Sequence, residues 1–306
     1  MKITQVVPVY LKYITALGRS HYTIRCAKYD LARFARHLAD QDVTGIEDLS
    51  RQVLEDYQQE LCFTLTGQGK PLSVKTQEKR LCTVKCFTRF LAAQDYLVHD
   101  PGRCIQLPKQ PRRLPKVILS PLDIKHLMAA CDMQTVMGYR DRVVLEILYD
   151  TALRRSELAY LKVTDLDLEA GVALVNGKGG KQRVVPVSAR VCELIGTYLA
   201  GIRPSYVHGK DPGYLFLNPE GKAVNAHLIW QVVRRCARLA KLKTKITTHT
   251  FRHSCATHML KNGAPIRHLQ EMLGHESLST TQLYTHVTIN DLKKVHAKYH
   301  PSATAK

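Results

Sequence analysis

The spacing of apolar residues predicts that the first hundred residues are helical. Apolar positions recur every three or four residues in four segments, at 6–17 before Gly18, at 20–39, at 49–61 and at 73–94. The polar segment 64–71 between the last two contains two glycines and is predicted to be a loop. The residues expected to face inward are Val6, Val9, Tyr10, Tyr13 and Leu17 in the first helix, Ile24, Leu31, Phe34, Ala35 and Leu38 in the second, and Leu81, Val84, Phe87, Phe90 and Leu91 in the fourth.

The rest of the chain combines helical and strand patterns. Ser120 followed by Pro121 is a typical helix start, and a strongly apolar helix is expected from Arg140 to Tyr149. The other expected elements are helices at 189–199 and 227–242 and short strands at 166–168, 172–175, 183–187 and 215–217. The pattern therefore predicts a mainly α protein with a small antiparallel β-sheet in its second domain, which is an α+β fold.

A proline-rich and basic segment separates the two halves. Residues 100–116 contain four prolines and five basic residues, among them Arg112 and Arg113. This composition is typical of an extended, semi-rigid linker, and its charge suits contact with a phosphate backbone. We therefore expect a helical domain at 1–107, a linker at 108–116 and a second domain at 117–306.

The chain is strongly basic, with 45 Lys and Arg residues against 26 Asp and Glu, a formal net charge of +19 and an isoelectric point of about 9.6. This excess favours a polyanionic partner, and nucleic acid is the first candidate. On the fourth predicted helix, Lys75, Lys79 and Arg80 suggest a surface that contacts the DNA backbone. Basic residues on a helix also commonly form no more than a solvated face.

The sequence predicts neither a membrane segment nor a metal site. No apolar run approaches the length of a bilayer-spanning helix, and the first residues lack the apolar region and cleavage signal of a signal peptide. The nine cysteines are scattered, as in a reducing compartment, so we expect a cytoplasmic protein, or a nuclear one if its source has a nucleus. Cys82 and Cys86 stand one helical turn apart, but no Cys/His pair at zinc-ligand spacing accompanies them.

The candidate chemistry is concentrated at residues 247–286, which are predicted to form three short helices. His249 and Arg252 stand three apart at the start of the first helix, where free backbone N–H groups and the helix dipole favour an anion. His275 directly follows the helix-ending Gly274, and Tyr284 comes nine residues later. These groups suggest phosphoryl transfer. The same segment also fits a helix-turn-helix that only grips phosphates, in which the tyrosine is a packing residue.

Two further basic residues stand at special positions in the second domain. In Thr151–Leu158, Ser156 is expected to cap a short helix, which leaves Arg154 in the tight turn before it. The alternative is a surface arginine that pairs with Asp150 or Glu157. Lys178 lies at the tip of the predicted hairpin 176–181, whose glycines join two strands and lack the spacing of a nucleotide-binding P-loop.

Together these segments resemble the tyrosine recombinase, or phage integrase, family, and most closely its Xer-like and mobile-element members. TALRRSEL resembles the first arginine box of the family, NGKGGKQRVVPV its β-hairpin lysine, HTFRH its His-x-x-Arg-His box and LGHESLSTTQLYTHV its nucleophile box. The four boxes stand in the order and spacing of the family. One departure is Ala152, where the family usually has glycine, and it is expected to stiffen the turn before Arg154.

The resemblance implies a reaction and a fold. Tyr284 would attack the scissile phosphodiester and form a 3′-phosphotyrosine, while Lys178 protonates the departing 5′-oxygen. Arg154 and Arg252 would donate to the non-bridging oxygens and stabilise the charge of the transition state. The implied fold is a two-domain, C-shaped clamp on DNA, with a core-binding, SAM-like first domain.

The resemblance also implies the supporting groups and the partners. His249 would transfer the proton at the nucleophile, His275 would donate to a phosphate oxygen, and Glu157 and His253 would orient these groups. No metal, nucleotide or other cofactor is implied, because the phosphotyrosine conserves the energy of the phosphodiester bond. The implied partners are double-stranded DNA with a specific recombination site and three further recombinase copies. Together with this chain, these copies would form a homo-tetramer, or a hetero-tetramer with a related recombinase, that exchanges strands through a Holliday junction.

Three other functions remain open from the sequence. A type IB topoisomerase uses similar groups but relaxes DNA as a monomer, and a helix-turn-helix regulator would bind DNA without cutting it. RNA binding is the least expected, because the aromatic stacking motifs of the common RNA-binding modules are missing. The tail at 290–299 has apolar residues at helical spacing, and we expect it to dock on a neighbouring protomer, as family tails do.

Overall fold

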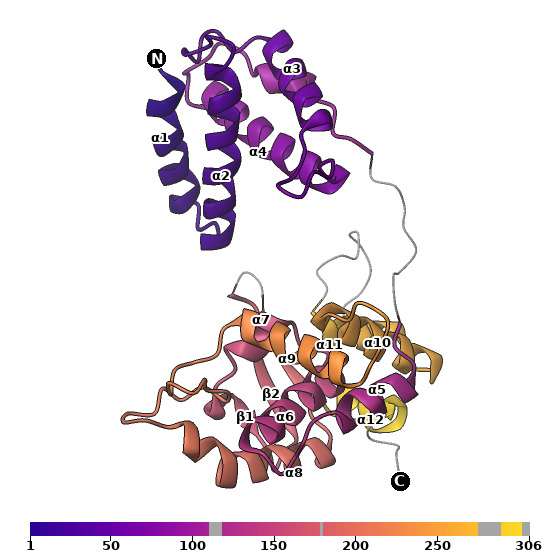
Figure 1. The fold of residues 1–306 in the computed structure, drawn as a ribbon. Coiled ribbons are helices and arrows are strands. Elements are labelled where there is room, and N and C mark those ends of the chain that lie inside the picture. Colours follow the sequence, from indigo (N-terminus) through magenta and orange to yellow (C-terminus); the bar gives the residue numbers. More distant parts are fainter. Residues whose placement is uncertain (110–117, 178–179, 275–288, 302–306) are drawn as a thin grey trace. The chain divides into compact units, whose positions relative to one another are not determined.

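The computed structural model describes residues 1–109, 118–177, 180–274 and 289–301. The chain divides into two compact units, Met1–Arg113 and Leu114–Lys306, and each is described by itself (Figure 1). Both units are mainly helical, and the second contains a three-stranded antiparallel sheet, which confirms the predicted fold class. Among the described helices, none combines the length and the apolar composition needed to cross a bilayer.

The first unit contains four α-helices, one in each segment that the sequence predicts to be helical. They are α1 (Ile3–Ala16), α2 (His21–Ala39), α3 (Arg51–Phe63) and α4 (Val74–Ala93), followed by a 3₁₀ turn, η1 (Pro101–Cys104). Serine hydroxyls at Ser20, Ser50 and Ser73 accept the N–H three residues ahead and cap α2, α3 and α4. The third helix therefore begins two residues later than predicted, because Ser50 is its cap.

The core of the first unit is formed by large residues of all four helices. Leu31, Phe34, Tyr57, Phe87 and Leu91 are completely buried. In α1 the buried residues are Ile3, Val6, Tyr10 and Ile14, so the prediction of inward positions at Val9, Tyr13 and Leu17 was wrong. Spacings of three, four and four keep the observed stripe on one helical face, whereas Val9 and Tyr13 lie on a neighbouring face.

The second unit surrounds the buried helix α6 with shorter helices and the small sheet. Its helices are α5 (Pro121–Ala129), α6 (Val136–Thr151), α7 (Arg155–Ala159), α8 (Ala189–Thr197), α9 (Ala226–Leu239), α10 (Thr248–Lys261), α11 (Ile266–Leu273) and α12 (Ile289–Tyr299). After α7 comes the 3₁₀ turn η2 (Val163–Asp165). After α8 come the π-helical turn η4 (Tyr198–Ile202) and the 3₁₀ turn η5 (Arg203–Tyr206).

The sheet has the order β1 (Leu166–Asp167), β2 (Val172–Asn176) and β3 (Gln182–Pro186), and all neighbours are antiparallel. Asn176 pairs with Gln182, so the hairpin predicted around Lys178 is present up to its described ends. The strand predicted at 215–217 was wrong. Within the described chain, this segment has only isolated bridges, one between Lys162 and Tyr214 just before it and one between Leu217 and Ala223 at its end.

The C-terminal helix α12 packs on its own unit, against β3, α10 and α11. Val295 and Tyr299 lie against the core, and His296 and His300 are buried. Asn262 Nδ2 also donates a hydrogen bond of 2.7 Å to the Tyr299 carbonyl. The described part of the tail, residues 289–301, thus packs on its own second unit, and docking on a neighbouring protomer stays an expectation.

The start of α5 generates a stability prediction. Ser120 Oγ accepts the Asp123 N–H at 3.1 Å, and Asp123 accepts the Ser120 N–H at 2.9 Å, which forms a capping box. Ser120→Ala should lower the free energy of unfolding of the second unit by about 1 kcal/mol. Trp230, the single tryptophan, lies on α9 in this unit, so its fluorescence during urea unfolding reports the change. Ser120→Thr keeps a capping hydroxyl and should fall within a few tenths of wild type; equal losses in both variants would refute the capping role.

Candidate active site

The C-terminal end of α11 collects three arginine side chains from distant parts of the chain. The helix ends at Gly274, in the left-handed conformation with φ 62°, as predicted. The last carbonyls of a helix have no partner within it. Here Arg183 Nε donates to the Met272 carbonyl at 3.0 Å, Arg252 Nη2 donates to the Leu273 carbonyl, and Arg154 Nη2 donates to the Gly274 carbonyl at 3.1 Å. The negative end of the helix dipole further stabilises these cations.

Arg154 occupies the N-cap position of α7. The predicted cap at Ser156 was wrong, because α7 begins at Arg155 and Glu157 takes over the capping role. Glu157 Oε2 accepts the Arg154 backbone N–H at 2.8 Å, and its Oε1 accepts Arg154 Nη1 at 2.7 Å. Arg154 therefore lies in the expected turn and also forms the ion pair with Glu157 that was the alternative prediction. The Arg154 side chain remains 31% exposed, which leaves N–H donors accessible to a ligand.

Arg183 is the residue of this site that the sequence analysis missed. It lies on β3 and donates to both carboxylate oxygens of Glu157, at 3.0 and 2.8 Å. Burial alone would raise the pKa of Glu157, but the hydrogen bonds from Arg183 and Arg154 outweigh it and hold the pKa below its ordinary value. Arg183 stands two residues before the buried Val185 on the same face of the strand. A cationic residue on the inward face of a predicted strand was thus the signal that could have identified Arg183.

Arg252 is buried on α10 and lies near Arg154. It is 8% exposed, and its Nη1 donates to the Ala152 carbonyl at 2.7 Å. Burial, followed by the neighbouring charge of Arg154, lowers the pKa of Arg252 to about 10, so it remains charged at pH 7. Ala152 itself has φ 52°, in the left-handed region that favours glycine, and it ends α6. This conformation explains physically why a glycine would suit the position.

The two histidines of the HTFRH segment differ in their surroundings. His249 lies exposed on the first turn of α10. Partial burial of the ring, followed by the charges of Arg155, Arg252 and Arg154, lowers the pKa of His249 and so favours its neutral form. His253 is exposed as well, and within the described residues its ring forms no hydrogen bond. The structure therefore groups His249 with the arginines but gives no contact by which His253 would orient them.

A pocket of about 380 Å³ lies beside Arg154 and Glu157 and reaches Asn176 and Gly177 at the end of β2. A Cβ at Gly177 would lie 3.8 Å from Glu157 Oε1, so the base of the hairpin adjoins the site. The described chain thus meets the site at Gly177 and at Gly274, the residues before two predicted catalytic groups. Five predicted residues lie outside the described residues: Lys178, His275, Tyr284, Arg112 and Arg113.

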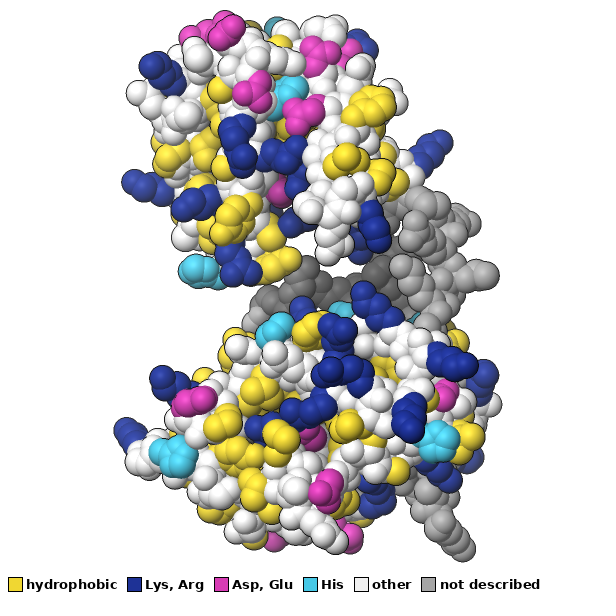
Figure 2. Space-filling model, viewed as in Figure 1, with side chains coloured by type: hydrophobic (Ala, Val, Ile, Leu, Met, Phe, Trp, Pro, Cys, Tyr) yellow, Lys and Arg dark blue, Asp and Glu magenta, His cyan; other side chains and the backbone are white. Residues whose placement is uncertain are grey.

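Basic side chains also cover parts of both units. On the second unit, Lys and Arg side chains gather on one face (Figure 2). On α4 of the first unit, Lys75 and Lys79 are exposed, whereas Arg80 is half-buried. Lys79 Nζ and the Arg25 guanidinium lie 5.9 and 5.7 Å from the centroid of the exposed Tyr22 ring. Two basic residues of α2 and α4 have internal partners instead, Arg33 with Glu60 and Lys85 with the Ile105 carbonyl.

The buried carboxylate of Glu157 generates a pH-dependent prediction. Glu157→Gln should lower the free energy of unfolding of the second unit by roughly 3 kcal/mol at pH 7, because two guanidiniums lose their counter-charge. The lowered pKa means that ionised Glu157 contributes stability above the ordinary pKa of glutamate, and this contribution is lost as the pH falls through the lowered value.

Urea unfolding followed by Trp230 fluorescence should therefore show a gap between wild type and Glu157→Gln that narrows below about pH 4. Glu220→Gln, at an exposed loop position, is the control and should match wild type at every pH. A gap that stays constant down to pH 2 would contradict the electrostatic origin.

The sequence was compared with known families and relatives. It matches the phage integrase family at residues 118–291 and the phage integrase N-terminal SAM-like domain at residues 8–95. The tyrosine recombinases XerD of Staphylococcus aureus (strain N315) and of Staphylococcus epidermidis (strain ATCC 35984) are each 36% identical to it over 299 residues. These alignments cover 97% of this chain and 99% of each relative.

Solved structures share the fold at lower identity. The XerH recombinase bound to its difH substrate is 22% identical, with a TM-score of 0.66 over 89% of this chain and 78% of that one. A λ integrase dimer on a core site is 15% identical, with a TM-score of 0.69 over 94% and 100%. The Tn1549 transposon integrase is 20% identical, with a TM-score of 0.67 over 96% and 98%. From its sequence relatives and the family match, the chain belongs to the phage integrase family, the tyrosine recombinases, which break and rejoin DNA strands in site-specific recombination.

Proposed function

We propose that this chain exchanges DNA strands at a specific recombination site through a 3′-phosphotyrosine on Tyr284. The observation that carries the assignment is the convergence of Arg154 and Arg252 at the C-terminal end of α11, one residue before His275. Each guanidinium has five N–H donors, and two hydrogen bonds to the protein leave others for the oxygens of a phosphate. Arg154 is paired with the Glu157 carboxylate, whereas the Arg252 hydrogen bonds go to carbonyl oxygens. The positive charge of these two guanidiniums therefore favours an anionic ligand between them.

In the proposed reaction, the Tyr284 oxygen forms a bond to phosphorus as the bond from phosphorus to the 5′-oxygen breaks. Lys178 gives its proton to the leaving oxygen, which departs as a 5′-hydroxyl. Arg154 and Arg252 donate to the non-bridging oxygens and stabilise the added negative charge of the transition state. Attack of a 5′-hydroxyl from the other duplex reverses these steps and releases Tyr284.

The histidines have proton-transfer and hydrogen-bonding roles in this scheme. His249 accepts the phenolic proton of Tyr284, a role supported by the lowered pKa of its ring, which favours the neutral form. His275 donates to a phosphate oxygen. Glu157 keeps Arg154 in its turn through two hydrogen bonds and thereby orients the donors that remain. For His253 we retain a supporting role through contacts made only when DNA is bound.

The proposed partners are double-stranded DNA and further copies of a recombinase. The first unit and the linker at 108–116 would contact the DNA backbone, and the second unit would carry the chemistry. A λ integrase tetramer has been solved on a Holliday junction and XerH on its substrate, and both share this fold. By that analogy we propose a tetramer, of this chain alone or with a related recombinase, that acts through a Holliday junction.

The nucleophile can be tested with a nicked suicide substrate built from the site that the chain selects out of a random-sequence DNA pool. Wild type should form a covalent protein–DNA adduct on denaturing gels, and Tyr284→Phe should form none, because the attacking oxygen is gone. Tyr160→Phe is the matched control, since Tyr160 is an exposed phenol that lines the pocket beside Arg154. It should form the adduct as wild type does.

Adduct formation by Tyr284→Phe at the wild-type level would move the nucleophile elsewhere. Relaxation of supercoiled DNA without a specific site would indicate a topoisomerase-like enzyme instead. DNA binding that is unchanged in Tyr284→Phe, with no adduct from wild type under any condition, would leave only a DNA-binding regulator.

The DNA-backbone contacts proposed for Lys75, Lys79, Arg80, Arg112 and Arg113 predict a steep salt dependence of binding. Lys75→Ala and Lys79→Ala should each weaken binding and reduce the slope of log K against log[salt] by about 0.9, since one fewer phosphate is neutralised. Fluorescence anisotropy between low and moderate salt measures both quantities. Lys12→Ala, at an exposed position on α1, is the charge-matched control. An equal change of slope in Lys12→Ala would show that only net charge matters and would remove α4 from the interface.

A further inference from the structure

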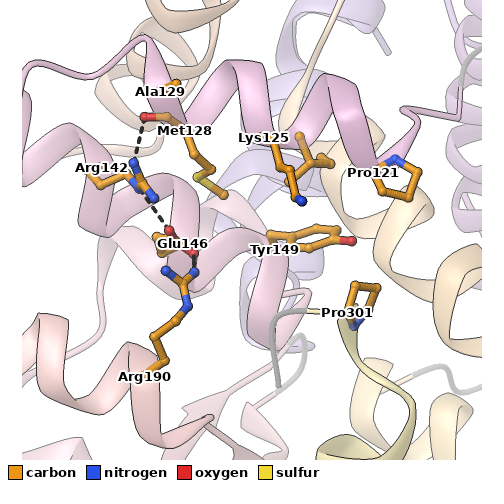
Figure 3. Close-up of a pocket in the computed structure, with 10 residues that line it drawn as sticks. Pro121, Lys125, Met128, Ala129, Arg142, Glu146, Tyr149, Arg190 and Pro301 are labelled. Atoms are coloured by element: carbon orange, nitrogen blue, oxygen red, sulfur yellow. Dashed lines mark hydrogen bonds and ion pairs between the residues drawn. The ribbon is translucent and has the colours of Figure 1, made fainter. Parts of the chain in front are cut away.

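A cluster of buried titratable side chains, which the proposed reaction does not use, lies where the end of α12 meets the end of α6. Asp150, His296 and His300 are 0%, 2% and 0% exposed. Asp150 Oδ1 lies 3.5 Å from His296 Nε2 and 3.7 Å from His300 Nδ1. The two imidazole rings stack with their centroids 4.6 Å apart and an angle of 11° between them. Figure 3 shows Pro301, the residue after His300, beside Tyr149 of α6.

We propose that Asp150, His296 and His300 bind a divalent transition-metal ion, most suitably Zn²⁺, that fastens α12 to the second unit. Two imidazoles and one carboxylate are a common zinc donor set when the fourth position is left to water. With metal–ligand distances near 2.0–2.1 Å, the edge of a tetrahedral site is about 3.3 Å long. The observed separations of 3.5 and 3.7 Å exceed that edge by only a few tenths of an ångström.

An unsatisfied carboxylate oxygen provides independent support. Asp150 Oδ2 accepts the Ser188 N–H at 2.8 Å, but Oδ1, although completely buried, accepts no hydrogen bond from the part of the chain that is described. Burial of a charged oxygen without a donor is costly, and a bound cation would supply the missing interaction. Ser188 Oγ is likewise buried without a hydrogen-bond partner among the described residues, next to the same carboxylate.

The hydrogen bond of His300 directs its lone pair toward the proposed site. His300 Nε2 donates to the Tyr149 carbonyl at 2.9 Å, so the neutral ring carries its lone pair on Nδ1, the atom near Asp150 Oδ1. Metal-bound imidazoles typically donate their other N–H to a carbonyl in this way.

His296 must change its hydrogen bond to become a ligand. Its Nε2 lies 2.7 Å from the Asp150 carbonyl oxygen, and a nitrogen that coordinates a metal carries no proton to donate. Metal binding therefore exchanges this hydrogen bond for a metal–nitrogen bond. A pocket of about 460 Å³ lined by Ser188, Cys192 and His296 gives a route for the ion and for a water ligand. Because α12 begins five residues after Tyr284, the bound metal would anchor the chain directly behind the nucleophile.

Cobalt provides a direct probe, because tetrahedral Co²⁺ with nitrogen and oxygen ligands absorbs in the visible range. The full chain, freed of metal with a chelator, should bind one equivalent of Co²⁺ and develop these bands, without the near-ultraviolet charge-transfer band of thiolate ligands. Zn²⁺ should displace the Co²⁺ and raise the melting temperature. His296→Gln, His300→Gln and Asp150→Asn should each weaken Co²⁺ binding at least tenfold, and their melting temperatures should no longer respond to Zn²⁺.

His227→Gln is the matched control, because His227 is an exposed histidine on α9 outside the cluster, and it should bind Co²⁺ as wild type does. Circular dichroism establishes which variants are folded, and Asp150→Asn keeps the shape of the side chain if a histidine variant does not fold. Absence of stoichiometric Co²⁺ and Zn²⁺ binding in wild type would overturn the proposal. So would wild-type binding by a folded variant of the cluster. Neither result depends on recombination activity.

Discussion

The C-terminal carbonyls of α11 are the point on which the arrangement of the site depends. Three guanidiniums repel one another, so they can lie close together only where negative partial charges of the protein stabilise them. The carbonyls of Met272, Leu273 and Gly274 supply that charge, and one carboxylate, Glu157, neutralises part of the excess. Three guanidiniums and one carboxylate leave a net positive charge, and burial, followed by the charge of Arg154, lowers the pKa of Arg252. The protein thus gives each arginine hydrogen-bond partners and leaves the group with excess positive charge, which favours an anionic ligand such as a phosphodiester.

Local rules were enough to predict much of the fold. Serine caps, a proline after Ser120 and the left-handed glycine Gly274 act over three or four residues, so they can be read directly from the sequence. The same is true of the hairpin, whose glycines lie between two alternating apolar runs. The residue types of the candidate site could also be named, because the boxes combine unusual polar groups with fixed spacing.

Features that depend on packing between distant segments could not be predicted in this way. Arg183 contacts Glu157, 26 residues away, and the Met272 carbonyl, 89 residues away. Its one local signal is its place on the strand face that also carries the buried Val185, and neither of its partners can be read from the sequence. Arg154 was expected before a helix capped by Ser156, but the carboxylate of Glu157 gains more as a cap because it also neutralises Arg154. The histidines of the tail could not be linked to their partner because Asp150 lies 146 residues before His296 and 150 residues before His300.

The end of α6 connects these separate features within five residues. Asp150 meets the histidines of α12, the Ala152 carbonyl accepts Arg252, and Arg154 donates to Gly274. Ala152 holds this segment in a left-handed turn that costs an L-residue roughly 1–2 kcal/mol. Such a conformation persists only if its surroundings stabilise it, and the hydrogen bond from Arg252 does so from α10. A shift of α12 that moved Asp150 would therefore displace the turn, and with it the Arg154 donors that we propose for the phosphate. Movement of the tail would in this way affect the proposed reaction without any contact between the tail and DNA.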